Sequence, residues 1–441
     1  MRKARLPLII GFLLVAAVFA APTILRTIPP RYLARFPEPL QRIGAPRDQA
    51  PTLPTAAAAA NPQSLLETVE AEVTIEARPA TPTPQPIIEP TSDSTAPIPT
   101  ATNTIPTITP TATPPPLPNA VRLEGFEHKF QSWNNCGPAT LAMTLSYFGM
   151  RLSQTQAADV LKPNPEDRNV SPDELVAYVE NETPFRAIFR ANGKLETVKR
   201  LLANGHPVVL EIGIEPPGEY QWMGWYGHYL LVVAYDDDAE QLWVYDSWFG
   251  TSEEPLQNAH KDGRILSYSE VERYWPHFNR NYIAFYRPEE EENLTGIIGA
   301  EMSDAIMWHQ ALHSVQAETA AEPDNAFLWF NLGTIYNALG QYEQAATAFD
   351  QARSIGLPWR MLWYQFGPYE AYYQVGRYEE MIMLADLTLK DRPYFEESYY
   401  YKGMAQAALG DLDAARDALA KAVAFQPGFT PAADALERIG N

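Results

Sequence analysis

The apolar residues near the start of the chain form one continuous run. It extends from Leu6 to Leu25, with basic residues before it and Arg26 after it. A positive flank followed by an apolar stretch is typical of an export signal, and this run is about as long as a bilayer span requires. We expect residues 1–36 to be a membrane anchor or, as the alternative, a signal peptide cleaved at Val18–Ala20. Either reading places the rest of the chain outside the cytoplasmic membrane.

The next stretch, residues 37–119, shows no hydrophobic period. It is rich in Pro, Thr and Ala, as in Pro106–Pro116. A segment of this composition cannot bury a core and is typical of a stiff, extended spacer. The sequence therefore predicts a disordered linker between the N-terminal segment and the remainder, and a short helix at Gln63–Val73 is compatible with it.

Residues 120–290 change from a helical pattern to a strand pattern along the chain. Helix signals open this stretch, because Pro138 suits a first helical turn and Ser171-Pro172 suits a cap followed by one. Two further helices are expected, one after Ser153 and one over Lys194–Ala203. Short apolar runs separated by turn residues come afterwards and indicate strands, at 207–214, 229–235, 241–246 and 282–286. Helices followed by an antiparallel sheet predict an α+β domain.

The last stretch, residues 300–441, is helical and internally repeated. Gly340, Gly376 and Gly410 recur about every 34–36 residues, which is the tetratricopeptide period. Around Gly340 the expected aromatic and small positions are occupied, by Trp329, Leu332, Gly333, Tyr336, Tyr342, Ala345, Phe349 and Ala352. We predict an all-α solenoid of helix hairpins that binds a protein partner or the substrate.

Composition removes several classes of function. The 441 residues carry a net charge of −21, and an acidic protein repels phosphate backbones, so we expect no nucleic-acid partner. Of the 40 prolines, 19 lie in residues 37–119, and the chain has a single cysteine. One cysteine excludes an intrachain disulfide and a zinc site built on paired cysteines. His309 and His313 lie one helical turn apart, but no third ligand is evident, so we predict neither a metal nor a cofactor.

Four residues of the α+β region have the chemistry that thiol hydrolysis needs. Cys136 lies where a loop meets a helix, and a helix N-terminus favours negative charge and offers backbone N–H groups. His228 precedes a strand, and Asp246 ends the next one, so that two neighbouring antiparallel strands bring them together. Gln131 is an amide donor just before the thiol, suited to a developing oxyanion.

Each of these residues also has an ordinary structural explanation. The inference of a catalytic role depends on the order in which all four occur along the sequence. Taken alone, Cys136 is a buried helix-start residue, Gln131 a loop residue, His228 a solvent-facing strand residue and Asp246 a turn cap. Together they form the constellation of a nucleophile, a base, an orienting carboxylate and an oxyanion donor. For substrate binding we expect Gly137, which lets a substrate approach the backbone, and the aromatic segment Trp225-Tyr226-Gly227.

The same residues resemble a known family. The segments Gln131, Asn135–Met143, Tyr147–Gly149, His228–Asp236 and Val244–Asp246 are similar to the double-glycine (bacteriocin-leader) peptidase family, and most of all to its secreted, stand-alone branch. The resemblance implies a bacterial papain-like cysteine peptidase with a Cys-His-Asp triad and a Gln at the oxyanion hole. Three positions depart from the family pattern. Ser247 stands where Pro is usual, Ala234 where Gly is common, and the gap between Gln131 and Cys136 is one residue tighter.

The sequence therefore predicts an extracytoplasmic thiol hydrolase of peptide or amide bonds, tethered through its N-terminus and joined to tetratricopeptide repeats. Two alternatives stay open. The first is a catalytically weak papain-like domain in a tethered scaffold whose work is done by the repeats. The second is an acyl or isopeptide transferase that uses the same triad.

Overall fold

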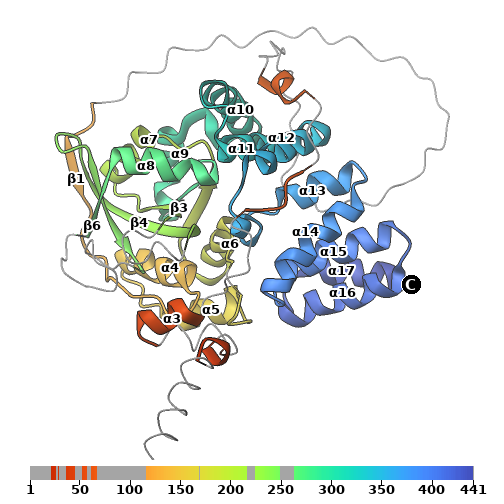
Figure 1. Ribbon diagram of the computed structural model, residues 1–441. Helices are drawn as coiled ribbons and strands as arrows, with labels where there is room; N and C mark the ends of the chain where they lie inside the picture. The colour runs from red at the N-terminus through yellow and green to blue at the C-terminus, as the bar shows by residue number, and fades with distance from the viewer. Residues whose placement is uncertain are drawn as a thin grey trace, which may run out of the picture.

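The computed structural model describes residues 21–25, 28, 36–44, 52–56, 61–66, 116–167, 169–215, 224–248 and 263–440 (Figure 1). Most of the apolar run that begins at Leu6 lies outside these ranges, so the expected anchor is not observed directly. Within the described ranges, no helix combines the length and the apolar character that crossing a bilayer demands. The short helix α3 spans Glu38–Gly44.

One antiparallel sheet of seven strands forms the centre of the first domain. Its order is β2-β7-β3-β4-β5-β6, and β1 pairs with the far end of β4. The strands are β1 (Ala120–Arg122), β2 (Arg186–Arg190), β3 (Val208–Ile214), β4 (Tyr226–Asp236), β5 (Gln241–Asp246), β6 (Arg264–Ser267) and β7 (Tyr282–Tyr286). The predicted strands are all present, whereas β1, β2 and β6 are additional.

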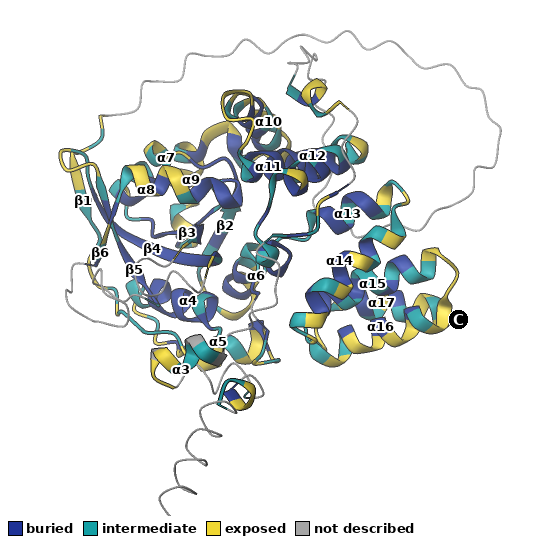
Figure 2. Cartoon of the chain, viewed as in Figure 1, coloured by how far each residue is buried: buried dark blue, intermediate teal, exposed yellow. Residues whose placement is uncertain are grey.

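Strand β4 is buried along almost its whole length because both faces of the sheet are covered (Figure 2). Successive side chains of a strand point to opposite faces. Accordingly, Leu231 and Val233 belong to a core shared with the first helices, and Leu230 and Val232 belong to a second core on the other face. The near-continuous apolar run of β4 is the sequence signature of this double burial.

Four helices lie at the positions that the sequence predicts. They are α4 (Cys136–Tyr147), α5 (Gln154–Leu161), α6 (Pro172–Glu182) and α7 (Leu195–Ala203). Ser153 and Ser171 cap α5 and α6, each through a reciprocal pair of hydrogen bonds with the residue three positions later. The helices do not all precede the strands, because β1 opens the domain, β2 lies between α6 and α7, and α8 lies between β6 and β7. The remaining helical turns before the repeats are α8 (Tyr268–Tyr274), η3 (Trp275–Phe278), η4 (Pro288–Glu290), α9 (Glu291–Ile298) and η5 (Gly299–Met302).

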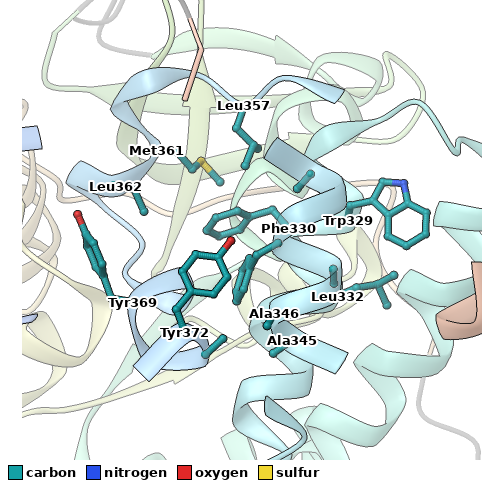
Figure 3. Close-up of a cluster of buried hydrophobic side chains, with 14 of the residues drawn as sticks. Trp329, Phe330, Leu332, Ala345, Ala346, Leu357, Met361, Leu362, Tyr369 and Tyr372 are labelled. Atoms are coloured by element: carbon teal, nitrogen blue, oxygen red, sulfur yellow. The ribbon is translucent and has the colours of Figure 1, made fainter. Parts of the chain in front are cut away.

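The C-terminal part is the predicted array of helix hairpins. Its elements are α10 (Asp304–Ala321), α11 (Ala326–Ala338), α12 (Tyr342–Ile355), η6 (Trp359–Trp363), α13 (Gly367–Gln374), α14 (Tyr378–Asp391), α15 (Glu396–Ala408), α16 (Leu412–Phe425) and α17 (Thr430–Gly440). Aromatic and small residues alternate where the helices cross (Figure 3). Gly333 shows why: a Cβ there would lie 2.5 Å from the ring of Phe349. The fold class predicted from the sequence, α+β followed by a helical solenoid, is therefore confirmed.

The two domains share a packed contact. The indole of Trp225 lies between the rings of Phe278 and Phe327, and His277 stacks on Phe327 with ring centroids 3.6 Å apart. Trp225 and Phe278 come from the sheet domain, yet they belong to the same buried cluster as the first repeat helices. The first repeat helices therefore pack directly against the sheet domain, next to the start of β4.

Two pieces of the linker also pack against the repeats. Residues 52–56 are extended, and the 3-10 helix η1 spans Pro62–Leu66. Leu53 and Leu65 are buried in the cluster of the repeat helices. The prediction of a spacer without tertiary contacts was wrong for these residues, because two isolated leucines in a proline-rich stretch suffice to dock it.

Candidate active site

Cys136 is the first residue of α4 and is partly exposed. The loop before it is held by Gln154, whose Oε1 accepts from the Ser132 backbone N–H at 2.7 Å and whose Nε2 donates to the Phe130 carbonyl at 2.8 Å. Asn135 also donates to Ser132 Oγ at 2.9 Å. These bonds fix the approach of the loop, so that the thiol stands at the helix N-terminus in a defined position.

A buried lysine supports the same loop from the other side. Lys162 Nζ donates to the carbonyl of Asn134 at 3.0 Å and to that of Asp167 at 2.7 Å. It thereby connects the segment that precedes Cys136 to the loop between α5 and α6. The positive φ of Asn134, +55°, turns the chain into the helix at this point.

The structure brings His228 and Asp246 together. His228 lies on β4 and Asp246 at the end of β5, and the register pairs Asp246 with Leu230, two residues from His228. Residues two apart on a strand share a face, so the two side chains meet diagonally across the pair of strands. His228 Nε2 lies 2.8 Å from Asp246 Oδ1, and both side chains are almost fully buried. The other ring nitrogen, Nδ1, is therefore the one left for a thiol.

Asp246 is the electrostatic centre of this site. Its Oδ1 also accepts from the Trp248 backbone N–H at 2.8 Å, and its Oδ2 accepts from the Arg264 guanidinium at 2.9 Å. Burial would raise the pKa of this carboxyl, but His228 and Arg264 together hold the pKa well below its usual range. Asp246 is thus a permanent carboxylate at physiological pH.

The imidazole of His228 responds to this charge. Burial alone would lower its pKa, yet Asp246 and the Cys136 side chain raise the pKa of His228 to about 9. Cys136 therefore lies close enough to the ring to contribute to this rise in the pKa of His228. The three side chains predicted from the sequence therefore form one coupled group, arranged as thiol, imidazole and carboxylate.

Gln131 is held by Ser247, the residue that replaces the usual proline. The Gln131 backbone N–H donates to the Ser247 carbonyl at 2.8 Å, and Ser247 Oγ donates to Gln131 Oε1 at 2.8 Å. This pairing uses the amide oxygen of Gln131. Its amide nitrogen Nε2 has no acceptor among the residues that the structure describes and is free to donate to a ligand.

The predicted substrate-binding residues adjoin Cys136 and His228 in sequence, and each has packed neighbours. Trp225 and Gly227 are packed at the contact with the repeats, and a Cβ on Gly227 would meet Phe278 at 2.6 Å and Tyr364 at 3.1 Å. Tyr226 carries the guanidinium of Arg360 on its ring, 3.9 Å from the centroid. Gly137 is buried against Val170, 3.1 Å from where its Cβ would stand. These contacts give each residue a packing role, and their assignment to substrate binding stays a prediction.

Sequence reasoning missed several residues around the site. Arg264, Ser247, Gln154 and Lys162 each position another group, and His128 Nε2 contacts the Asp246 carbonyl at 2.9 Å. Only Ser247 gave a signal, since it departs from the family pattern directly after Asp246. Within the described ranges, no group of three or more His, Cys, Asp or Glu side chains is placed to hold a metal ion.

Comparison with known proteins agrees with this architecture. Residues 122–281 match the Peptidase_C39 like family, and residues 318–347 and 396–429 match tetratricopeptide repeats. A solved structure described as a C39-like peptidase from Bacillus anthracis is 16% identical, covering 38% of this chain and 98% of that chain with a TM-score of 0.30. No curated protein matches the chain. The chain thus combines a C39-like, papain-type peptidase domain with tetratricopeptide repeats, which are modules of protein–protein interaction.

Proposed function

We propose that this protein is a thiol hydrolase of peptide or amide bonds that works through Cys136, His228 and Asp246. The observation that carries the proposal is the coupled group itself. A thiol at a helix N-terminus acts on a buried imidazole, whose second nitrogen is held 2.8 Å from a carboxylate. A nucleophile, a base and an orienting group in contact are the signature of an activated cysteine.

In the proposed reaction, the Cys136 sulfur attacks the carbonyl carbon of the scissile bond. His228 Nδ1 accepts the thiol proton and then donates it to the leaving amine, because Nε2 is committed to Asp246. Water then attacks the resulting thioester, with His228 as the base, and restores the free thiol. Asp246 stabilises the imidazolium that forms in both steps, and it remains ionised throughout.

The negative oxygen of each tetrahedral intermediate needs donors close to the thiol. Gln131 Nε2 supplies one, because Ser247 fixes the amide oxygen on the opposite side. The backbone N–H of Cys136 supplies the second, since the first N–H groups of a helix have no partner within the helix. Donors fixed in advance stabilise a developing oxyanion without reorganisation.

The decisive experiment is labelling with a peptide-like, thiol-reactive probe. A catalytic Cys136 reacts faster than a free thiol at neutral pH, and Cys136→Ala removes both labelling and turnover while the fold persists. Mapping is unambiguous because the chain has one cysteine. Undiminished turnover in Cys136→Ala would refute the hydrolase. Added amine acceptors separate hydrolysis from acyl transfer, since a transferase forms the new amide at the expense of the free acid.

A second experiment tests the oxyanion donors. Gln131→Ala should lower kcat by about 10²–10³-fold, the usual effect of losing one such donor. Ser247→Ala should produce a smaller loss in the same parameter, because the amide remains but its orientation is no longer fixed. Ser247→Thr keeps the hydroxyl and serves as the matched control. Equal kcat in all three variants would remove Gln131 from the proposed mechanism.

The proposal also includes a location. The basic start and the apolar run from Leu6 support an N-terminal membrane anchor with residues 120–441 on the outer side. External protease should therefore reach these residues on intact cells, and protection would refute the location. Sequencing of the mature N-terminus separates an anchor from a cleaved signal.

A further inference from the structure

The linker pieces described above are held by specific contacts as well as by apolar burial. Residues 52–56 and 61–66 touch the first repeat helices, α10 to α12, and the turn that follows them. These pieces are separated from the repeats by more than 230 residues of sequence, so their contacts belong to tertiary structure. The chemistry of each piece shows what the repeats recognise.

The first piece pairs its backbone with the repeats. The Leu53 N–H donates to the Leu357 carbonyl at 2.8 Å, and Thr52 forms an antiparallel bridge with Pro358. On the other side, Arg353 Nε donates to the Pro54 carbonyl at 3.0 Å. Leu53 is only 2% exposed and reaches the cluster that contains Leu357 (Figure 3).

The second piece is held by one carbonyl and one side chain. The Leu65 carbonyl accepts two hydrogen bonds, from Gln316 Nε2 at 2.7 Å and from Tyr336 Oη at 3.0 Å. The Leu65 side chain is buried in the same cluster as Leu53. Gln316 on α10 and Tyr336 on α11 thus converge on a single carbonyl from two different helices.

Three buried polar side chains of the repeats are therefore directed at backbone carbonyls of the linker. Gln316, Tyr336 and Arg353 are all less than 9% exposed. A buried donor without a partner is costly, so such groups are normally satisfied. Two buried leucine positions and three donors for carbonyls make a peptide-binding site. In this chain its occupants are residues 52–56 and 61–66.

We propose that the repeat domain binds its own N-terminal linker as a resident ligand, through Leu53, Leu65 and the carbonyls of Pro54 and Leu65. The linker segment binds intramolecularly to the repeats. It thereby occupies a site that would otherwise accept an extended, leucine-containing peptide. Because the segment is covalently attached, its effective concentration is on the order of millimolar, and even modest affinity keeps it bound. A partner that uses this site must displace residues 52–66.

Amide hydrogen exchange in the full-length chain tests this proposal. The Leu53 amide should exchange more than about tenfold slower in the wild type than in the double variant Leu53→Asp/Leu65→Asp. In that variant, repeat peptides covering 313–320 and 353–358 should also exchange faster, because the linker no longer packs over these segments. Peptides from α4 report whether the fold as a whole is intact, and their exchange should not change.

The matched control places the same charges on neighbouring exposed positions. Thr55 and Ser64 lie in the same two pieces and are exposed, so Thr55→Asp/Ser64→Asp should retain the wild-type protection. Tyr336→Phe removes one donor to Leu65 and should weaken protection of 61–66 more than that of 52–56. The proposal is overturned if residues 52–66 exchange at the rate of an unstructured peptide in the wild type, or if the control variant is as disruptive as the leucine variant.

Discussion

Two regions of this molecule bury carboxyl groups. The surroundings favour the ionised form in one region and the protonated form in the other. In the candidate active site, Asp246 meets His228 and Arg264, both within 2.9 Å. At the contact between the peptidase domain and α15, Glu396 and Glu397 are buried beside Asp167. Neither glutamate forms a salt bridge with any residue that the structure describes. The nearest support is Asn169 Nδ2, which donates to Glu397 Oε1 at 3.1 Å.

The protonation states follow from these surroundings. The pKa of Asp246 is held far below its usual range, as described above. Burial raises the pKa of Glu396 and Glu397, with added repulsion from Glu397 on Glu396 and from Asp167 and Glu174 on Glu397. Burial with nearby Asp167 raises the pKa of Glu174 to about 7. The comparison teaches that burial alone does not neutralise an acid. The cation partner decides whether a buried carboxyl stays charged, as catalysis requires, or holds its proton.

The largest expected effect concerns Asp246, the buried carboxylate that has cationic partners. Asp246→Asn should lower kcat by about 10²–10⁴-fold, because a neutral amide cannot stabilise the imidazolium of His228. Steady-state kinetics or the rate of probe labelling measures the loss. Asp236→Asn is the matched control, since Asp236 ends the same strand as His228 but accepts only turn amides. If Asp236→Asn is the damaging change and Asp246→Asn is silent, the proposed triad is wrong.

The buried glutamates without a cationic partner should give the stability of the protein an unusual pH dependence. A carboxyl whose pKa is raised on folding binds more protons in the folded state, so stability falls as pH rises above the unfolded value of about 4.3. For Glu174 this decline should end near pH 7. His228 adds a second decline as pH rises toward about 9, whereas Asp246 loses its contribution only as pH falls below about 4.

We therefore expect maximal stability between about pH 4 and 5, with a progressive loss toward pH 9. Urea unfolding of the full chain at pH 5, 7 and 9 measures it. A free energy of unfolding that rises over this interval would show that the acids at the domain contact are charged and compensated after all.

A smaller effect should follow from removing Arg264, the cation beside Asp246. Arg264→Gln keeps a donor for Asp246 Oδ2 but removes the charge, so the pKa of Asp246 should rise toward its usual value. The carboxylate then survives at neutral pH through His228, and we expect only about a tenfold loss in kcat/KM, equivalent to about 1.4 kcal/mol. The loss should grow as the assay pH is lowered. A loss independent of pH would assign Arg264 a packing role instead.

The active-site pair could be predicted because its signals are local. The apolar runs of β4 and β5 are short, distinct and joined by a turn, so their register brings His228 next to Asp246. The partners that set the charge could not be predicted, since Arg264 lies 18 residues further along the sequence than Asp246 and nothing near it in sequence marks its target. Strand β2, Arg186–Arg190, was missed because arginines at both ends hide its apolar centre.

The domain contact and the docked linker were invisible for a related reason. Glu396 and Glu397 occupy the first turn of α15, where acids are favourable on an exposed helix, so the sequence indicates a solvated end rather than a buried one. Leu53 and Leu65 are single apolar residues among prolines and threonines, and periodicity does not detect them. In both cases the burying surface comes from a part of the chain more than 200 residues away.

The smallest effect on stability is expected for Glu397→Gln. This variant is also the most direct test of the contrast between Glu397 and Asp246. If Glu397 holds its proton in the folded protein, glutamine is nearly isosteric with it, and Oε1 can still accept from Asn169. At pH 5 the free energy of unfolding should change by less than about 0.5 kcal/mol. At pH 8 the variant should be more stable than the wild type by about 1–2 kcal/mol, because its unfolded state no longer gains from ionising a carboxyl that folding keeps neutral. Glu379→Gln, at an exposed position of α14, should show no such difference between the two pH values. A Glu397→Gln variant that is destabilised equally at pH 5 and pH 8 would mean that Glu397 is ionised when folded, and the contrast with Asp246 would then fail.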